Sequence, residues 1–133
     1  MITVTNTINA SIEKVWKFWT TPEHITKWNN ASPDWHSPFA ENDLTVEKRF
    51  RYTMAAKDGS MSFDFEGTYT NIEKYAVIEY ILDDDRKVQI SFEKTKNGTK
   101  IIESFDPENE NTLELQKNGW QAILDNFKKY VEQ

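Results

Sequence analysis

Hydrophobic and polar residues alternate in two stretches of this chain. Near the N-terminus Ile2, Val4 and Ile8 fall on alternate positions, which is typical of a strand with one buried face. From 44 to 106 the period of two persists and is interrupted by turn signals, of which Asn97-Gly98 is the strongest. The pattern therefore predicts a first strand and, after a gap, an antiparallel meander of five strands.

Two short helices are predicted in the gap. Ser11 can cap the first, and Thr21-Pro22-Glu23 supplies a cap, a first-turn proline and a first-turn acid for the second. Residues 29–43 after them are predicted to be a loop, because Pro33 and Pro38 interrupt any regular pattern.

A long amphipathic helix is predicted at the end of the chain. Apolar residues recur at spacings of three and four from Leu113 to Val131, with Gln116 as the one polar member of the stripe. Gly119 also lies in the stripe, where glycine costs about 1 kcal/mol relative to alanine. Either the helix begins later, with Gly119 near its start, or its backbone closely approaches the sheet or a ligand there.

This order of elements predicts an α+β fold in a single domain spanning residues 1–133. The long helix has one apolar stripe to bury, and the sheet has one apolar face. We expect the helix to lie across the concave face of a curved antiparallel sheet of about six strands, with the two short helices closing one end. Such a helix-grip arrangement often leaves a cavity between sheet and helix.

Composition narrows the functional classes. The chain has 16 Lys and Arg against 22 Asp and Glu, so its net charge of −6 argues against a nucleic-acid or membrane partner. It has no cysteine, which excludes disulfides, thiolate metal sites and cysteine nucleophiles. Neither a targeting segment nor an apolar run of about 18 residues occurs, so we expect a cytoplasmic protein.

Several segments resemble one known family. The segments 11–16 (Ser-Ile-Glu-Lys-Val-Trp) and 21–28 (Thr-Pro-Glu-His-Ile-Thr-Lys-Trp) resemble the opening of the heat-shock-protein-90 ATPase activator-homologue family, within the START-like (SRPBCC, birch-pollen-allergen-like) superfamily. Further similarities are Phe50-Arg-Tyr-Thr-Met54 with Asp58-Gly59, Phe65-Glu-Gly-Thr-Tyr69, Asn97-Gly-Thr99, and Gly119-Trp120 followed by Leu124 and Phe127. Together they cover essentially the whole chain in the right order.

The resemblance implies a helix-grip fold with an apolar cavity that binds hydrophobic small molecules. The family name implies an alternative, an interaction with a chaperone or another stress-response partner. Two departures fall near the expected cavity mouth, where this chain has Glu47-Lys48 in place of a glycine pair and Trp28-Asn29 in place of a tryptophan pair.

Large side chains on the predicted inner faces are the candidate ligand-binding residues. They either fill the space between sheet and helix or form the wall of a pocket. The set is Phe50, Tyr52, Phe63, Phe65, Tyr69, Trp120, Leu124 and Phe127.

Two charged residues are candidate polar anchors. Lys48 falls on the apolar face of its predicted strand, where an unpaired ammonium would be costly. Either a bulge or the sheet rim lets it reach water, or it binds an acidic group of the ligand, with Glu103 as its most obvious partner. Glu103 shares the parity of Ile101 and Phe105, although Ile102 leaves open which face of that strand points inward.

No constellation typical of catalysis or metal binding stands out. Asp34 and His36 could supply two metal ligands, but the sequence places no third. We therefore predict no catalytic residue, metal site or cofactor, and binding of a small hydrophobic molecule as the function. The alternatives are the chaperone interaction and a cyclase- or hydrolase-like enzyme that uses Lys48, Glu103 or His24 in the cavity.

Overall fold

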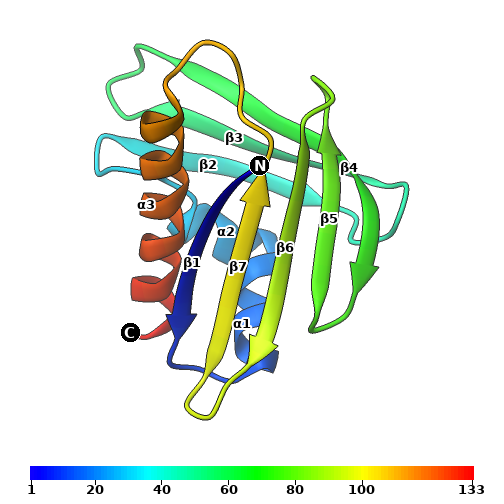
Figure 1. Cartoon of the computed structure of the whole chain (residues 1–133). Coiled ribbons are helices and arrows are strands. Elements are labelled where there is room, and N and C mark those ends of the chain that lie inside the picture. The colour runs from blue at the N-terminus through cyan, green and yellow to red at the C-terminus, as the bar shows by residue number, and fades with distance from the viewer.

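Seven antiparallel strands form one curved sheet in the computed structural model, which describes all 133 residues (Figure 1). The strands follow the order β1-β7-β6-β5-β4-β3-β2 across the sheet, so β1 and β2 are its edges. The strands are β1 (Ile2–Ile8), β2 (Trp35–Asn42), β3 (Arg49–Ala56), β4 (Ser62–Glu73), β5 (Val77–Leu82), β6 (Lys87–Lys94) and β7 (Thr99–Phe105). The helices are α1 (Ile12–Thr20), α2 (Pro22–Trp28) and α3 (Leu113–Val131).

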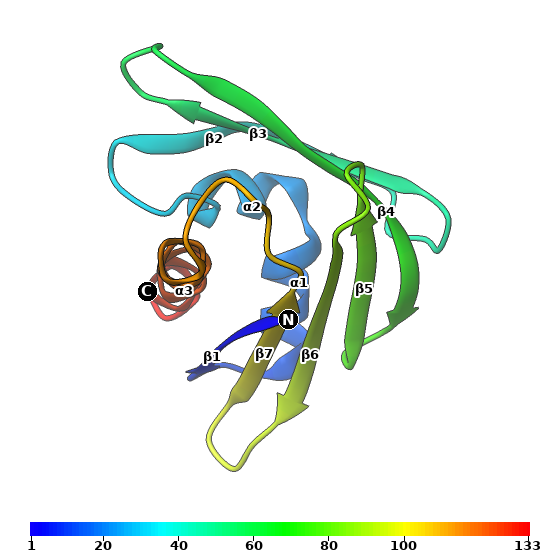
Figure 2. The same ribbon diagram turned by 45° about the horizontal axis from the view of Figure 1, so that its top comes forward.

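The sheet curls around all three helices (Figure 2). One hydrophobic core joins its concave face to the helices, and Leu124, Phe127 and Val131 of α3 are almost completely buried in it. The predicted α+β helix-grip fold is therefore confirmed, with seven strands in place of about six.

The additional strand is β2, so the predicted loop over residues 29–43 is wrong for most of its length. β2 pairs with β3 only and has a register shift between His36 and Phe39. Pro38 lies at this irregularity. A proline has no N–H to donate to a ladder and is tolerated on an edge strand or at a bulge, which is why its presence did not prevent strand formation.

The strand that follows begins later than predicted. Apolar residues continue the alternation at Leu44 and Val46, but β3 starts only at Arg49. Before it the chain turns, with Glu47 at a φ of 75° and its N–H donating to the backbone oxygen of Tyr69. As a result Lys48 is exposed in the turn and does not belong to the inner face of the strand.

Elsewhere the predicted faces hold, and the structure resolves the two that the pattern left open. Ile78 and Tyr80 of β5 point inward, and so do Ile101 and Glu103 of β7. On β4, Phe63 pairs with Met54 of β3 and shares the inward face with Phe65, but this end of the strand is little covered. Phe63 is 52% exposed and Met61, just before the strand, is 62% exposed.

Helix α3 changes character along its length. Its first turn is capped by the Thr112 hydroxyl, which accepts from the N–H of Leu115. Leu113 is 61% exposed, so its predicted place in the buried stripe is wrong. Gly119 is in the helix interior, so the helix does not begin there. A Cβ on Gly119 would meet no atom within 4 Å, so the helix backbone does not approach the sheet closely at this residue either.

Side chains of α3 also cover the edge strand β1, which lies beside it in Figures 1 and 2. Gln121 donates to the backbone oxygen of Thr5 at 3.1 Å, and Lys128 donates to that of Thr7 at 2.7 Å. The N–H of Asn9 donates to the Glu132 carboxylate at 2.7 Å. The free carbonyls on this edge are therefore partly satisfied by the helix.

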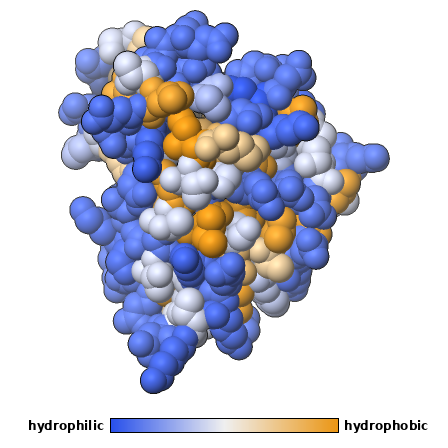
Figure 3. All heavy atoms as spheres, viewed as in Figure 1, coloured by the Kyte–Doolittle hydropathy of each residue, from blue (hydrophilic) through white to orange (hydrophobic).

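Hydrophilic residues cover most of the face that Figure 1 presents, and the hydrophobic residues visible on it form separate small groups (Figure 3). None of the three helices combines the length and the apolar character that a membrane-crossing helix requires.

We expect Gly119→Ala to stabilise the protein by roughly 0.5–1 kcal/mol, because alanine loses less backbone entropy in a helix and the site has room for a methyl group. Urea unfolding followed by circular dichroism measures the change. A lower unfolding midpoint for this variant would contradict the free space around Gly119.

Gly67→Ala is the matched control in the same measurement. A Cβ at Gly67 would lie 2.6 Å from the backbone oxygen of Ile81 and 3.0 Å from the Phe50 ring. We expect this variant to lose roughly 1–3 kcal/mol through overpacking.

Candidate ligand-binding cavity

A cavity of about 300 Å³ lies between the concave face of the sheet and the N-terminal half of α3. This volume is at the lower end of the range of small-molecule sites, about 300–1,000 Å³. The sheet contributes mainly Tyr52, Phe65, Tyr69, Ile78 and Tyr80, while α3 contributes Gln116, Trp120 and Ile123.

Aromatic rings from α1 and α2 close the deep end of the cavity. Trp19 and Trp28 line it, with ring centroids 4.8 Å apart. Phe127 packs edge-on against both, at 4.9 Å from Trp19 and 4.8 Å from Trp28. The indole N–H of Trp28 donates to the backbone oxygen of Phe18 at 3.0 Å, so this buried polar group is satisfied away from the cavity.

The structure divides the eight predicted cavity residues into two groups. Phe50, Leu124 and Phe127 are at most 2% exposed and belong to the packed core, not to the cavity wall. Phe50 takes this place because its ring fits against Gly67, which has no side chain to exclude it. The cavity is lined by the other five, namely Tyr52, Phe63, Phe65, Tyr69 and Trp120.

Several residues that line the cavity were not predicted from the sequence. Trp19 and Trp28 were placed on the short helices, but nothing in the pattern showed that these helices reach the cavity. Tyr80 was missed because apolar residues occupy both parities of its strand (Val77, Ile78, Ile81 and Leu82), so periodicity did not define its face. Met54 of β3 also lines the cavity and was not among the predicted residues.

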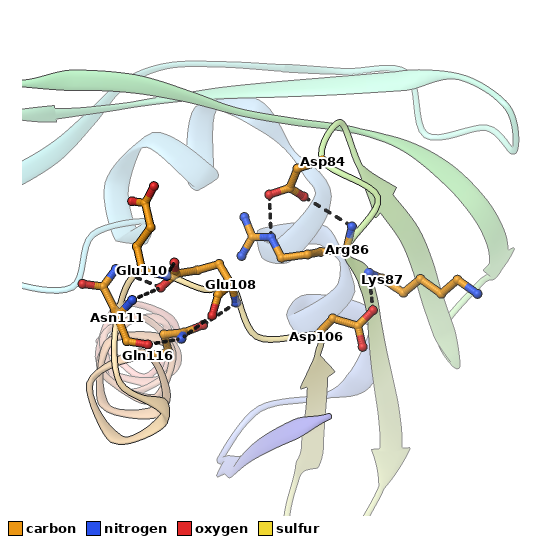
Figure 4. A network of polar contacts seen from close by, with 8 residues as sticks. All are labelled: Asp84, Arg86, Lys87, Asp106, Glu108, Glu110, Asn111 and Gln116. Carbon is orange, nitrogen blue, oxygen red and sulfur yellow. Dashed lines mark hydrogen bonds and ion pairs between the residues drawn. The ribbon is translucent and has the colours of Figure 1, made fainter.

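Charged and polar residues form the rim of the cavity. Arg86, in the turn between β5 and β6, pairs with Asp84 at 2.7 Å. Glu108, in the connection between β7 and α3, accepts from the backbone N–H groups of Glu110 and Asn111. Figure 4 shows the Arg86 side chain extending toward Glu108. Both residues line the cavity, so they face each other across its mouth.

Hydrogen bonds stabilise both the ionised form of Glu108 and the conformation of the loop that carries it. The backbone N–H of Glu110 and the Asn111 side chain hold the pKa of the Glu108 carboxyl below its usual range. Gln116 of α3 orders the same connection, because its side chain donates to the backbone oxygens of Glu108 and Asn111. The rim at this side is therefore ionised and held in a defined shape.

Glu103 is a buried carboxyl in the wall of the cavity. It is 6% exposed, and its neighbours across the ladder are Val4 on β1 and Ile90 on β6. Burial alone raises the pKa of this carboxyl to about 8, and no hydrogen bond or ion pair opposes that rise. The nearby phenols of Tyr80 and Tyr69 also have pKa values raised by burial.

The other two polar candidates lie away from the cavity. Lys48 is exposed in the turn before β3 and does not pair with Glu103. Nδ1 of His24 lies 2.6 Å from the Tyr130 hydroxyl, and its ring stacks on Phe18 at 3.9 Å, outside the cavity lining. The three residues considered for an enzyme site are therefore not brought together. No group of three or more His, Asp or Glu side chains is placed to hold a metal ion.

A curved antiparallel sheet that grips a long C-terminal helix around an apolar cavity defines a START-like, helix-grip protein. Within this class the chain belongs to the activator of Hsp90 ATPase homolog 1-like family, whose family model matches residues 9–132. The resemblance found in the sequence is thereby confirmed.

Solved structures agree with this assignment. The chain is similar to an AHSA1-like protein of Aeromonas hydrophila, with 45% identity, a TM-score of 0.89, and coverage of 98% of this chain and 92% of that one. It is also similar to a protein of Cytophaga hutchinsonii, with 57% identity, a TM-score of 0.86, and coverage of 98% and 91%. A protein of Nitrosomonas europaea shares the fold at 16% identity, with a TM-score of 0.83 and coverage of 98% and 93%. No curated protein matches the chain.

We expect Glu103 to make the stability of the protein depend on pH. Its pKa of about 8 in the folded state lies above the value of about 4.3 in an unfolded chain. Between these values the folded state binds more protons, so the free energy of unfolding falls as pH rises, by about 3 kcal/mol from pH 5 to pH 8. Above pH 8 this contribution levels off.

Glu103→Gln tests this expectation, with Glu93→Gln on the exposed side of β6 as the control for loss of one acidic charge. Urea unfolding at pH 5 and pH 8 gives the change in the free energy of unfolding that each variant causes at each pH. Glu103→Gln stabilises the protein much more at pH 8 than at pH 5, whereas Glu93→Gln has a small effect at both. Equal effects of the two variants would show that Glu103 is solvated in the folded protein.

Proposed function

We propose that this protein binds a small hydrophobic molecule in the cavity between the sheet and α3, and that it carries this molecule without transforming it. The observation that carries the proposal is the aromatic-walled cavity of about 300 Å³ behind a polar rim. A few polar groups among mostly apolar walls are typical of small-molecule sites. His24 and Lys48, which an enzyme would need beside Glu103, lie elsewhere.

The energetic cost of an unfilled cavity supports this proposal. At about 24 cal/mol per Å³, a dry void of about 300 Å³ would cost on the order of 7 kcal/mol. That is comparable to the whole stability of a typical domain. Water gains no hydrogen bond from Ile78, nor from Trp28, whose indole N–H is already bonded to the backbone oxygen of Phe18. An apolar ligand removes this cost more effectively than water does.

The five tryptophans provide a direct test. Trp19, Trp28 and Trp120 line the cavity, whereas Trp16 packs against Phe92 in the core outside it. We expect saturable shifts of the three cavity indole N–H signals in NMR titrations with fatty acids, sterols, flavonoids and polyketide-like aromatics. The Trp16 signal serves as the internal reference and stays in place. No shift across the panel in a folded sample would contradict the proposal.

A cavity-filling variant makes the test specific. Ile123→Trp places a larger side chain in the cavity. We expect this variant to weaken binding of any ligand found by about tenfold or more. Ile102→Trp, on the outer face of β7, is the matched control and leaves the affinity unchanged. Equal affinities of both variants and the unaltered protein would place the ligand outside the cavity.

The family match favours interaction with a chaperone as a second candidate function, because the description of the family names activation of the Hsp90 ATPase. Such an activity uses the surface and does not need an occupied cavity. It predicts stoichiometric binding to Hsp90 and faster ATP hydrolysis. Absence of binding in a pull-down with purified Hsp90 would remove this candidate.

A further inference from the structure

Glu103 is an ionisable group without a partner in the wall of the cavity, whose other charged residues, Arg86 and Glu108, lie at its mouth. It is 6% exposed, its strand neighbours Val4 and Ile90 are apolar, and no donor within the protein reaches its carboxyl. A buried carboxyl in this state is costly, and an apolar residue of similar size would remove the cost. Its oxygens are therefore free to accept a hydrogen bond from a ligand in the cavity.

The walls around Glu103 suit a positive charge. The faces of aromatic rings attract ammonium groups, most strongly when both are shielded from water. Rings of Tyr69, Tyr80 and Trp120 line the same cavity, and Tyr80 lies close enough for the Glu103 charge to raise the pKa of its phenol. A carboxylate in a cavity lined by several aromatic rings is a combination that binds an alkylammonium group.

The mouth of the cavity favours entry of cations over anions. Arg86 is the one basic residue in the cavity lining, and its charge is balanced by the ion pair with Asp84. Glu108 faces it, Asp106 lies nearby, and Lys87 points away from the mouth (Figure 4). An acidic rim on a chain of net charge −6 concentrates cations at the entrance.

We propose that the ligand of this cavity is a hydrophobic amine, bound as its protonated form with the ammonium group on the Glu103 carboxylate and the apolar body against the aromatic walls. This proposal rests on the proposed function, because it names the chemical class of the molecule that the cavity takes.

The proposal implies a characteristic dependence on pH. The other titratable groups in the buried cavity wall are the phenols of Tyr52, Tyr69 and Tyr80, whose pKa values burial raises further above neutrality. The Glu108 carboxyl at the mouth, whose pKa is lowered by its hydrogen bonds, stays ionised in the same range. Glu103 is thus the group that titrates near neutral pH, and at its pKa of about 8 it is about one-tenth ionised at pH 7.

Amine affinity therefore rises with pH. Only the ionised carboxyl pairs with an ammonium, so the apparent affinity follows the ionised fraction and increases about tenfold from pH 7 to pH 9. An aliphatic amine with a pKa near 10 stays mostly protonated over this range. A neutral ligand of the same shape lacks this dependence.

The experiment compares 2-(1-naphthyl)ethylamine with 2-(1-naphthyl)ethanol, which has the same shape and no charge. Affinities are measured by isothermal titration calorimetry at pH 7 and pH 9 on the unaltered protein, on Glu103→Gln, and on Glu93→Gln as the control with the same charge change at an exposed site. We expect at least a tenfold preference for the amine at pH 9, lost in Glu103→Gln and retained in Glu93→Gln.

The other outcomes separate this proposal from the one on which it rests. Equal binding of amine and alcohol, unchanged by Glu103→Gln, would overturn the amine proposal and leave the hydrophobic-ligand function standing. Stronger binding of the alcohol, weakening above pH 8, would overturn it as well and show that Glu103 acts as a neutral hydrogen-bond donor. If neither probe binds and the wider panel of apolar molecules also fails, both proposals are wrong.

Discussion

Phe127 is the contact on which the arrangement of this molecule depends. Its ring is completely buried and packs edge-on against Trp19 of α1 and Trp28 of α2. The three rings fasten the C-terminal half of α3 to the short helices that close one end of the sheet. The N-terminal half of the helix is held by Trp120, whose ring stacks on the buried Phe105 ring at 3.9 Å. The cavity lies between this half of the helix and the concave face of the sheet.

The polarity of the cavity wall increases from the closed end, near α1 and α2, to the mouth. At the closed end the indoles of Trp19 and Trp28 meet each other, and the N–H of Trp28 donates to the backbone oxygen of Phe18. Glu103 is the one buried acid among the aromatic and uncharged polar residues of the wall. At the mouth, Arg86 and Glu108 are each held by hydrogen bonds from their own loops. A molecule entering from solvent therefore passes from charged to aromatic surroundings along one path.

The order of elements could be predicted from the sequence because periods of two and of three to four change at recognisable caps and turns. Ser11, Pro22 and Asn97-Gly98 mark such boundaries, and each lies at the end of an element in the structure. β2 could not be predicted, because Pro38 interrupts the alternation of its residues. An edge strand tolerates such a proline, since it pairs with one neighbour only, here β3.

The cavity was predicted less completely than the fold. Local alternation shows which side chains point inward, but not whether they meet other side chains or empty space. Phe50 and Phe65 point to the same face of the sheet from adjacent strands. Phe50 belongs to the packed core, whereas Phe65 lines the cavity. The difference lies in the distance to α3 and in the pocket that Gly67 leaves for the Phe50 ring, and both depend on the assembled fold.

The contacts between α3 and β1 bear on what the protein avoids as well as on what it binds. An open sheet with two free edges is a template for pairing with other copies, and a partly empty interior makes local opening easier. Here the carbonyls of Thr5 and Thr7 are occupied by Gln121 and Lys128. The opposite edge carries Pro38 and a register shift. The protein can therefore keep an internal cavity without exposing free strand edges that would pair with another copy.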